Sequence, residues 1–403
     1  MTQITTPPLG VISDASTQDS LFHKVTLRLV PFLFVCYLGA YLDRVNVGFA
    51  KLQMQKELGF SETVYGLGAG IFFLGYVLFE VPSNIILHKV GARLWLARVM
   101  LTWAIISAAT AFVKTPTSFY IARFLLGMAE AGFIPGVLLY LTLWFPAARR
   151  GRIMALFLTA IPMASILGGP LSGSILGVVS GAQGYSGWQW LFILESIPSL
   201  ILGVAILLYL DDRIETAKWL DAGEKRTLIA IMAHDERDKE GLSELRHAFV
   251  TPRVWLLGAT YFCIVCGIYI VSFWLPTIIK QTGVASPLTI GLLTAIPYIV
   301  AVIAMISTCA HADRTKERRW HTALPAVACA LGLVVTAAAL GDTLLALVGL
   351  TLAAAGASTA QASFWTLPSA FLSGAAAAAG IALVNSLGNV AGFASTYLVG
   401  WPT

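Results

Sequence analysis

The sequence predicts an all-α integral membrane protein. Of its 403 residues 57% are hydrophobic and only 12% are charged, about half the charged share of an ordinary soluble domain. The apolar residues gather in runs of about 20, the length of a helix that spans the hydrocarbon core of a bilayer. A membrane β-barrel would instead show alternating segments of about 10 residues. The composition therefore excludes a soluble enzyme, a disordered chain and a disulfide-rich scaffold.

Eleven apolar runs are long enough to span a membrane, and a charged stretch separates the first six from the last five. The expected spans are 25–50, 63–88, 93–113, 117–145, 151–178, 188–210, 251–279, 287–311, 321–340, 343–372 and 378–400. The expected organisation is a disordered tail at 1–22, a six-helix bundle at 23–210, a linker at 211–250 and a five-helix bundle at 251–403. The tail lacks the apolar core of a signal peptide.

Lysines and arginines indicate the orientation. If the N-terminus is cytoplasmic, the tail, linker and loops on that side hold 20 of the 26 lysines and arginines, and the opposite loops hold four. Cytoplasmic loops of membrane proteins are enriched in these residues. We therefore expect a cytoplasmic N-terminus and linker, and the odd number of spans then places the C-terminus outside.

Six charged residues lie inside the expected spans, all in the first half: Asp43, Arg44, Glu80, Arg123, Glu130 and Glu195. Each costs about 2.5–3.5 kcal/mol near the bilayer centre, so they indicate either a functional site or interhelical ion pairs. Asp43 and Arg123 are expected at the same depth, about 10 Å from the outer surface, where they can neutralise each other. Glu130 follows Arg123 by seven residues on the same helix face, near the midplane.

The functional interpretation is a central cavity in which Arg44 binds an anion and carboxylates carry a proton. The alternative is a set of ion pairs that only holds the half together. Tyr41 shares a helix face with Arg44, and Tyr76 is near the middle of the second span. Glu80 could belong to an inner gate or to a structural pair, and Glu195 is expected to be structural.

The second half offers neutral groups instead of charges. Asn385 and Asn389 share one helix face, where amides can bind the hydroxyls of a polyol or a neighbouring helix. Trp365 is a candidate aromatic wall of the cavity. All six histidines fall in tails, loops or span ends, so carboxylates are expected to carry any proton. The lone CxxC at Cys263 and Cys266 is expected to serve packing, and we expect no metal and no cofactor.

Two basic loops stand at matching places in the two halves. NIILHKVGAR follows the second span, and CAHADRTKERR follows the eighth. Their charges could clamp neighbouring helices in one gating state, or could only mark the cytoplasmic side. The candidate gating residues are His88, Lys89, Gly91, Arg93, Asp313 and Arg314.

Both loops match part of the loop motif of the major facilitator superfamily, G-x-x-x-D-R-x-G-x-R-R. Further segments are YLDRVNVGFA, RFLLGMAEAGFIPG, GGPLSG, WQWLFILE, FWTLPSAFLSG and GIALVNSLGNVAGF. Together, over about residues 22–400, they resemble the anion:cation symporters of that superfamily, in particular the bacterial tartrate, galactonate and related sugar-acid transporters. The resemblance implies two six-helix bundles, alternating access, and uptake of an organic anion with protons.

The resemblance also implies roles for single residues. The coupling carboxylates fall on Asp43 and Glu130, the anion-binding arginine falls on Arg44, and Arg123 falls on the partner of Glu130. Substrate-lining positions fall on Tyr41, Tyr76 and Asn389. The sequence departs from the family twice. The turn SGAAAAAG lacks the usual arginine, and the chain stops at GWPT after the eleventh span, so we expect the twelfth helix to be missing.

The leading hypothesis is a monomeric, proton-coupled symporter in the bacterial inner membrane. It would import a small organic anion such as tartrate or an aldonate, and nucleic acid is not an expected partner. One alternative is an exporter or antiporter of drugs or metabolites, since GGPLSG resembles the G-P-x-x-G pattern of antiporters. Another is a truncated chain that transports poorly. An enzyme is not expected, because the sequence lacks a nucleophile–base pair, a metal cluster and a phosphate loop.

Overall fold

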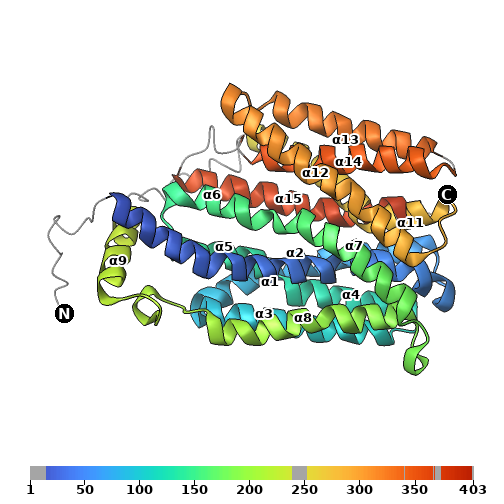
Figure 1. Ribbon diagram of the computed structural model, residues 1–403, viewed down its shortest axis with the longest axis horizontal. Coiled ribbons are helices and arrows are strands. Elements are labelled where there is room, and N and C mark those ends of the chain that lie inside the picture. Colours follow the sequence, from blue (N-terminus) through green and yellow to red (C-terminus); the bar gives the residue numbers. More distant parts are fainter. Residues whose placement is uncertain (1–14, 238–251, 340, 366, 368–373, 402–403) are drawn as a thin grey trace.

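The computed structural model describes residues 15–237, 252–339, 341–365, 367 and 374–401. Within these ranges every regular element is a helix, and no strand is found. Figure 1 shows the long helices side by side along the long axis of the molecule, with α9 (Ala222–Arg237) beside the start of α1 (Ala15–Leu58). The predicted all-α fold is confirmed.

The described helices fall into two groups along the chain. The first half contains α1, α2 (Glu62–Val90), α3 (Ala92–Ala109), α4 (Pro116–Glu130), α5 (Phe133–Thr142), α6 (Ala147–Leu158), α7 (Ala160–Val178) and α8 (Gly187–Tyr209). The second half contains α11 (Pro252–Gln281), α12 (Pro287–Thr315), α13 (Trp320–Ala338), α14 (Thr343–Phe364) and α15 (Gly374–Gly400). The charged linker contributes α9 between them.

Ten of the described segments are long and apolar enough to cross a membrane, judged by length and composition alone. They match the first ten expected spans. α15 covers the eleventh expected span and is helical, but it is not one of the ten. The chain is therefore a multi-pass membrane protein.

Three expected spans differ from the helices observed. The span expected at 117–145 is divided into α4 and α5, and the span expected at 151–178 is divided into α6 and α7. The span expected to reach residue 372 ends at Phe364, and residues 368–373 lie outside the described ranges. Hydropathy shows only how long an apolar run is. A helix can break inside such a run while the run stays apolar, so hydropathy does not reveal the break.

The division between α4 and α5 occurs directly after Glu130. Ala131 leaves the helical conformation, and Gly132 has a φ of +89°, a conformation that favours glycine because a side chain would be strained there. The Ser83 hydroxyl donates to the backbone oxygen of Ala131 at 2.7 Å. A broken helix leaves backbone groups unpaired inside the membrane, and this bond from α2 satisfies one of them.

The two halves pack together through three pairs of helices, α1 with α11, α2 with α15, and α7 with α12. Glycines allow this close approach. A Cβ atom added to Gly291 of α12 would lie 2.2 Å from the backbone oxygen of Gly169 in α7, and one added to Gly66 of α2 would lie 2.8 Å from that of Thr396 in α15. Gly66 and Gly291 lie near the starts of α2 and α12, which directly follow the ends of α1 and α11 along the chain, and we call this the closed end of the molecule.

Candidate functional site

Arg44 and Glu130 form a buried ion pair between α1 and α4. The Arg44 Nε donates to Glu130 Oε1 at 3.0 Å, and Arg44 Nη2 contacts the same oxygen. The two side chains are only 6% and 3% exposed. Pairing offsets part of the cost of burying each charge. In this conformation the direct contact of Glu130 is with Arg44, and Arg123, the partner that the resemblance implied, lies within electrostatic range of Glu130.

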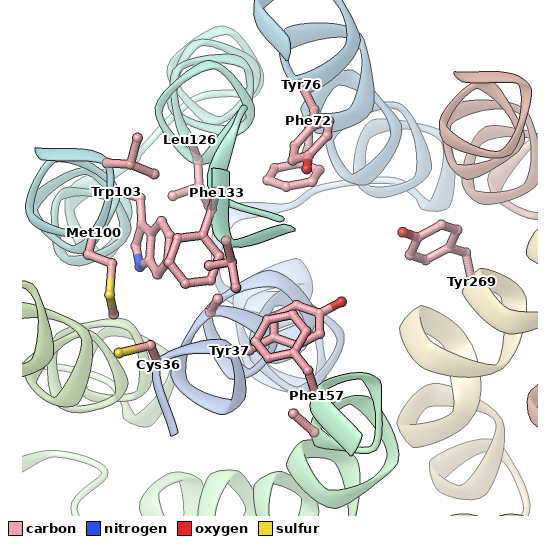
Figure 2. Close-up of a cluster of buried hydrophobic side chains, with 14 of the residues drawn as sticks. Cys36, Tyr37, Phe72, Tyr76, Met100, Trp103, Leu126, Phe133, Phe157 and Tyr269 are labelled. Carbon is pink, nitrogen blue, oxygen red and sulfur yellow. The ribbon is translucent and has the colours of Figure 1, made fainter. Parts of the chain in front are cut away.

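Aromatic side chains from both halves surround this ion pair. The ring centroids of Phe72 and Tyr76 in α2 lie 5.4 and 5.3 Å from Arg44 Cζ, close enough for cation–π attraction. The Tyr269 hydroxyl of α11 lies 3.5 Å from Arg44 Nη1. Figure 2 shows Phe72 and Tyr76 next to each other, with the Tyr269 hydroxyl pointing toward them from α11. Tyr269 was not among the predicted site residues, although Tyr269 and Ser272 are polar positions in an apolar span.

Asp43 points to a different place from its neighbour Arg44. Its Oδ2 accepts bonds from Trp103 Nε1 at 3.1 Å and Ser199 Oγ at 2.6 Å, and its Oδ1 accepts one from Ser107 Oγ at 2.9 Å. Its carboxylate is therefore fixed between α1, α3 and α8. The expected neutralisation of Asp43 by Arg123 is wrong in this conformation, because three neutral donors occupy the carboxylate instead.

Arg123 is fully buried, and its three guanidinium nitrogens have no hydrogen-bond partner among the described residues. Its Cζ lies 5.0 Å from the centroid of the Phe72 ring. Arg44 and Arg123 therefore lie against the same Phe72 ring. Arg123 adds a second cation beside the Arg44–Glu130 ion pair, an arrangement that suits a small anion.

A chain of hydroxyl groups crosses from one half to the other beside the ion pair. The Tyr41 hydroxyl lies 3.2 Å from Ser272 Oγ, which lies 3.3 Å from the Tyr298 hydroxyl. A small cavity adjoins this chain. Its lining residues are Leu42, Val45, Phe49, Ser165, Gly168, Gly169, Ser172, Ser272, Leu275, Pro276, Thr294 and Tyr298.

The amide pair expected on α15 contacts the charged half through one member. Asn389 Nδ2 donates to Glu80 Oε2 at 3.3 Å, so Glu80 of α2 and Asn389 of α15 join the two halves. Asn385 is half-buried on the same helix. Trp365 directly follows α14, and the centroids of the Trp365 and Tyr261 rings are 4.8 Å apart, within an aromatic cluster between α14 and α11.

The first basic loop is held by the end of α8. Gly91 has a φ of +95°, and a Cβ atom there would lie 3.0 Å from Asp212 Oδ1. The same oxygen accepts a bond from the Arg93 backbone nitrogen at 2.8 Å, and Arg93 Nη2 contacts the Leu207 backbone oxygen. Lys89 and Arg314 are exposed. The side chains of His88 and Asp313 lie outside the described part of the structure.

Glu195 of α8 borders the cavity through a serine. The Ser172 hydroxyl, which lines the cavity, donates to Glu195 Oε1 at 2.5 Å. Glu195 is 3% exposed, and its Oε2 has no partner among the described residues. The sequence predicted a structural role, and depth along the span gave no indication of this contact with the cavity wall.

Comparison with known proteins places the chain in a class of transporters. Residues 33–396 match the Major Facilitator Superfamily. The chain is also similar to the structure of a bacterial homologue of the human lysosomal transporter Spinster, in an inward-facing and unoccupied conformation. The TM-score is 0.75 at 15% identity, covering 96% of this chain and 83% of that one.

Three bacterial relatives are similar in sequence over nearly the whole chain. "Putative metabolite transport protein NicT" of Pseudomonas putida is 49% identical, covering 94% of this chain and 87% of the relative. "Putative tartrate transporter" of Agrobacterium vitis is 48% identical, covering 97% and 87%. "Quinolone resistance transporter" of Acinetobacter baumannii is 43% identical, covering 95% and 88%. The chain belongs to the major facilitator superfamily and is a membrane transporter, not an enzyme.

Proposed function

We propose that this transporter is a proton-coupled symporter that imports a small organic anion, such as a hydroxycarboxylate or a sugar acid. The observation that carries the proposal is the Arg44–Glu130 ion pair, which joins a group for an anion and a group for a proton at a break in a membrane helix. Transporters of this kind bind substrate near the midplane, between their halves. The relative named for tartrate supports this class of substrate.

Competition for Arg44 would couple the binding of the substrate anion to the binding of a proton. The planar guanidinium of Arg44 holds a carboxylate by charge-assisted hydrogen bonds, and a substrate carboxylate would compete with Glu130 for it. Glu130 would then be a buried charge without a close partner, and such a group takes up a proton rather than stay charged. Arg123 adds positive charge nearby and favours the anion. Anion binding and proton binding thus favour each other, as symport requires.

Neutral groups of both halves would bind the rest of the substrate. Tyr41 of the first half and Ser272 and Tyr298 of the second offer hydroxyls beside the cavity, and Asn389 of α15 offers an amide. These groups can exchange hydrogen bonds with the hydroxyls of a sugar acid. We assign Asn385 and Trp365 to the same wall.

The distribution of lysine and arginine supports an N-terminus in the cytoplasm of a bacterium and a place in the inner membrane. The closed end then faces outward, so we propose that the described conformation is the inward-open state of an alternating-access cycle. The loops with His88, Lys89, Gly91, Arg93, Asp313 and Arg314 lie at the inner end, where we propose that they contribute to the gate. The site is contained in one chain, which supports a monomer.

Uptake by proteoliposomes tests the proposal. Labelled tartrate or an aldonate should accumulate when the proton gradient is directed inward, and accumulation should stop when an ionophore collapses the gradient. Glu130→Gln should still exchange substrate across the membrane but should not accumulate it, because glutamine cannot carry the proton. Accumulation that persists without a proton gradient would contradict symport.

An exporter of drugs is the second candidate, and the relative named for quinolone resistance supports it. The GGPLSG segment has another explanation, however. A Cβ atom on Gly169 would lie 2.6 Å from the Gly291 backbone oxygen, and one on Gly173 would lie 2.5 Å from that of Pro287. These glycines are needed for packing α7 against α12 whatever the direction of transport. Quinolone efflux from loaded vesicles, without uptake of organic acids, would favour the exporter.

A further inference from the structure

A second polar opening lies at the closed end, away from Arg44 and Glu130. Its lining residues are Lys51, Leu52, Gln55, Lys56, Thr277 and Lys280. Four of these belong to α1 of the first half and two to α11 of the second. Lys51 follows Arg44 by about 10 Å along α1. The opening therefore spans the seam between the halves, about two helical turns from the central site.

Positive charge dominates this opening. Lys51 Nζ contacts Glu62 Oε2 at 2.5 Å, and Lys280 Nζ donates to the Leu52 backbone oxygen at 2.5 Å. An ammonium group has three hydrogens to donate, so both lysines retain donors that these contacts do not use. Lys280 also lies within electrostatic range of Lys51 and Lys56. Three lysines thus face one carboxylate.

Two of the side chains that line this opening are buried, so the opening differs from a group of exposed surface lysines. Lys51 is 2% exposed, and its Nζ lies 3.9 Å from the Trp274 ring centroid and 4.6 Å from that of Tyr65. Thr277 is 7% exposed, and its hydroxyl has no hydrogen-bond partner among the described residues. A buried hydroxyl without a partner is costly, so a ligand that accepts a hydrogen bond from Thr277 would remove this cost.

We propose that this opening binds a small anion, a carboxylate or an inorganic oxyanion, between Lys51, Lys56 and Lys280. The Thr277 hydroxyl donates to the same anion. The bound anion contacts α1 of one half and α11 of the other, and it neutralises like charges that face each other across the seam. It therefore stabilises the conformation in which this end is closed.

Thermal unfolding of the purified 403-residue chain tests the site, with sulfate and acetate as probes at constant ionic strength. Both probes should raise the unfolding midpoint saturably. Lys56→Gln/Lys280→Gln should weaken the apparent affinity by about tenfold or more, since charge-assisted hydrogen bonds are lost. Lys114→Gln/Lys218→Gln is the matched control, because it removes the same charge from exposed lysines elsewhere and should bind normally.

Thr277→Val separates specific binding from general attraction, because it removes a donor without changing charge. It should weaken binding as well, and the proposal is overturned if it binds as tightly as the native chain. An equal, unsaturated rise in every variant would also overturn it, since that is the behaviour of a general salt effect. A response to acetate alone assigns the site to carboxylates, and a response to both probes assigns it to small anions in general. Neither result depends on whether transport is coupled to protons.

Discussion

At the scale of single residues, two neighbours in the sequence have different surroundings. Asp43 and Arg44 point about 100° apart on α1, so Asp43 contacts α3 and α8 while Arg44 contacts Glu130 on α4. The sequence identified most of the charges that are buried in the first half, but it did not single out Lys51, which is 2% exposed. The sequence could not show which of these charges contact one another, because the depth of a residue in the membrane says nothing of the direction in which its side chain leaves the helix.

Arg44→Lys should impair transport although it keeps the charge. A lysine ammonium cannot reproduce the planar fork of the guanidinium, so we expect the apparent affinity for the organic anion to fall by about tenfold, or about 1.4 kcal/mol. Concentration-dependent uptake in proteoliposomes measures this. Arg98→Lys on α3 is a suitable control, because Arg98 stacks on Trp95 at 3.8 Å, outside the site. An unchanged affinity in Arg44→Lys would contradict direct binding of the substrate carboxylate.

Asp43→Asn distinguishes a proton carrier from a structural anchor. The asparagine oxygen can still accept from Trp103 and Ser199, and its amide can donate to Ser107, so we expect an unfolding midpoint close to that of the native chain. Asp43→Leu loses all three hydrogen bonds and leaves the three buried donors without a partner, which should destabilise the fold by about 1–3 kcal/mol. If Asp43 carries a proton, Asp43→Asn exchanges substrate but does not accumulate it. Normal accumulation in Asp43→Asn would leave Asp43 a structural role only.

At the scale of elements, the expected spans agree with the helices except where a helix breaks. Runs of apolar residues set the length of each helix, and this property is local. The break after Glu130 depends on Gly132 and on the Ser83 bond from α2, which is a tertiary contact. The contacts between halves depend on glycines in the same way, since which glycine faces another helix is decided only when the helices pack.

Gly291→Ala should destabilise the described conformation. The added methyl group would overlap the Gly169 backbone oxygen at 2.2 Å and force α7 and α12 apart, and overpacking of this kind costs about 1–3 kcal/mol. A lowered unfolding midpoint would show it. Gly177→Ala on α7 is the matched control, because a Cβ atom there has no neighbour within 4 Å. Equal midpoints for the two variants would mean that the halves do not meet closely at this place.

At the scale of the whole molecule, the halves pack closely at the closed end and differ in chemistry. The buried charges of the described spans lie in the first half, and the second half faces them with tyrosine, serine and asparagine. Alternating access requires that the closed end open during the cycle. The contacts of α1 with α11, α2 with α15 and α7 with α12 must then separate, and this movement can be blocked.

A cross-link across the closed end should stop transport. Gln55 of α1 and Lys280 of α11 line the same opening. A short flexible bis-maleimide, which adds one cysteine thiol at each end, should therefore join the cysteines of a Gln55→Cys/Lys280→Cys variant in a background without the five native cysteines. We expect uptake to fall to background after cross-linking while the central site still binds substrate from the other side. Each single-cysteine chain treated with the reagent is the control. Full uptake by the cross-linked protein would contradict movement at this end.

The chemical difference between the halves would assign ion coupling to the first half and substrate selectivity largely to the second. The groups that would bind the anion and the proton lie on α1 and α4, whereas the described contacts of the second half at the central site are neutral and come from α11, α12 and α15. Selectivity could then diverge by substitutions in the second half while the coupling machinery stayed intact. Relatives that carry chemically different cargoes would be expected to share Asp43, Arg44, Arg123 and Glu130, and to differ at positions such as Ser272, Tyr298 and Asn389.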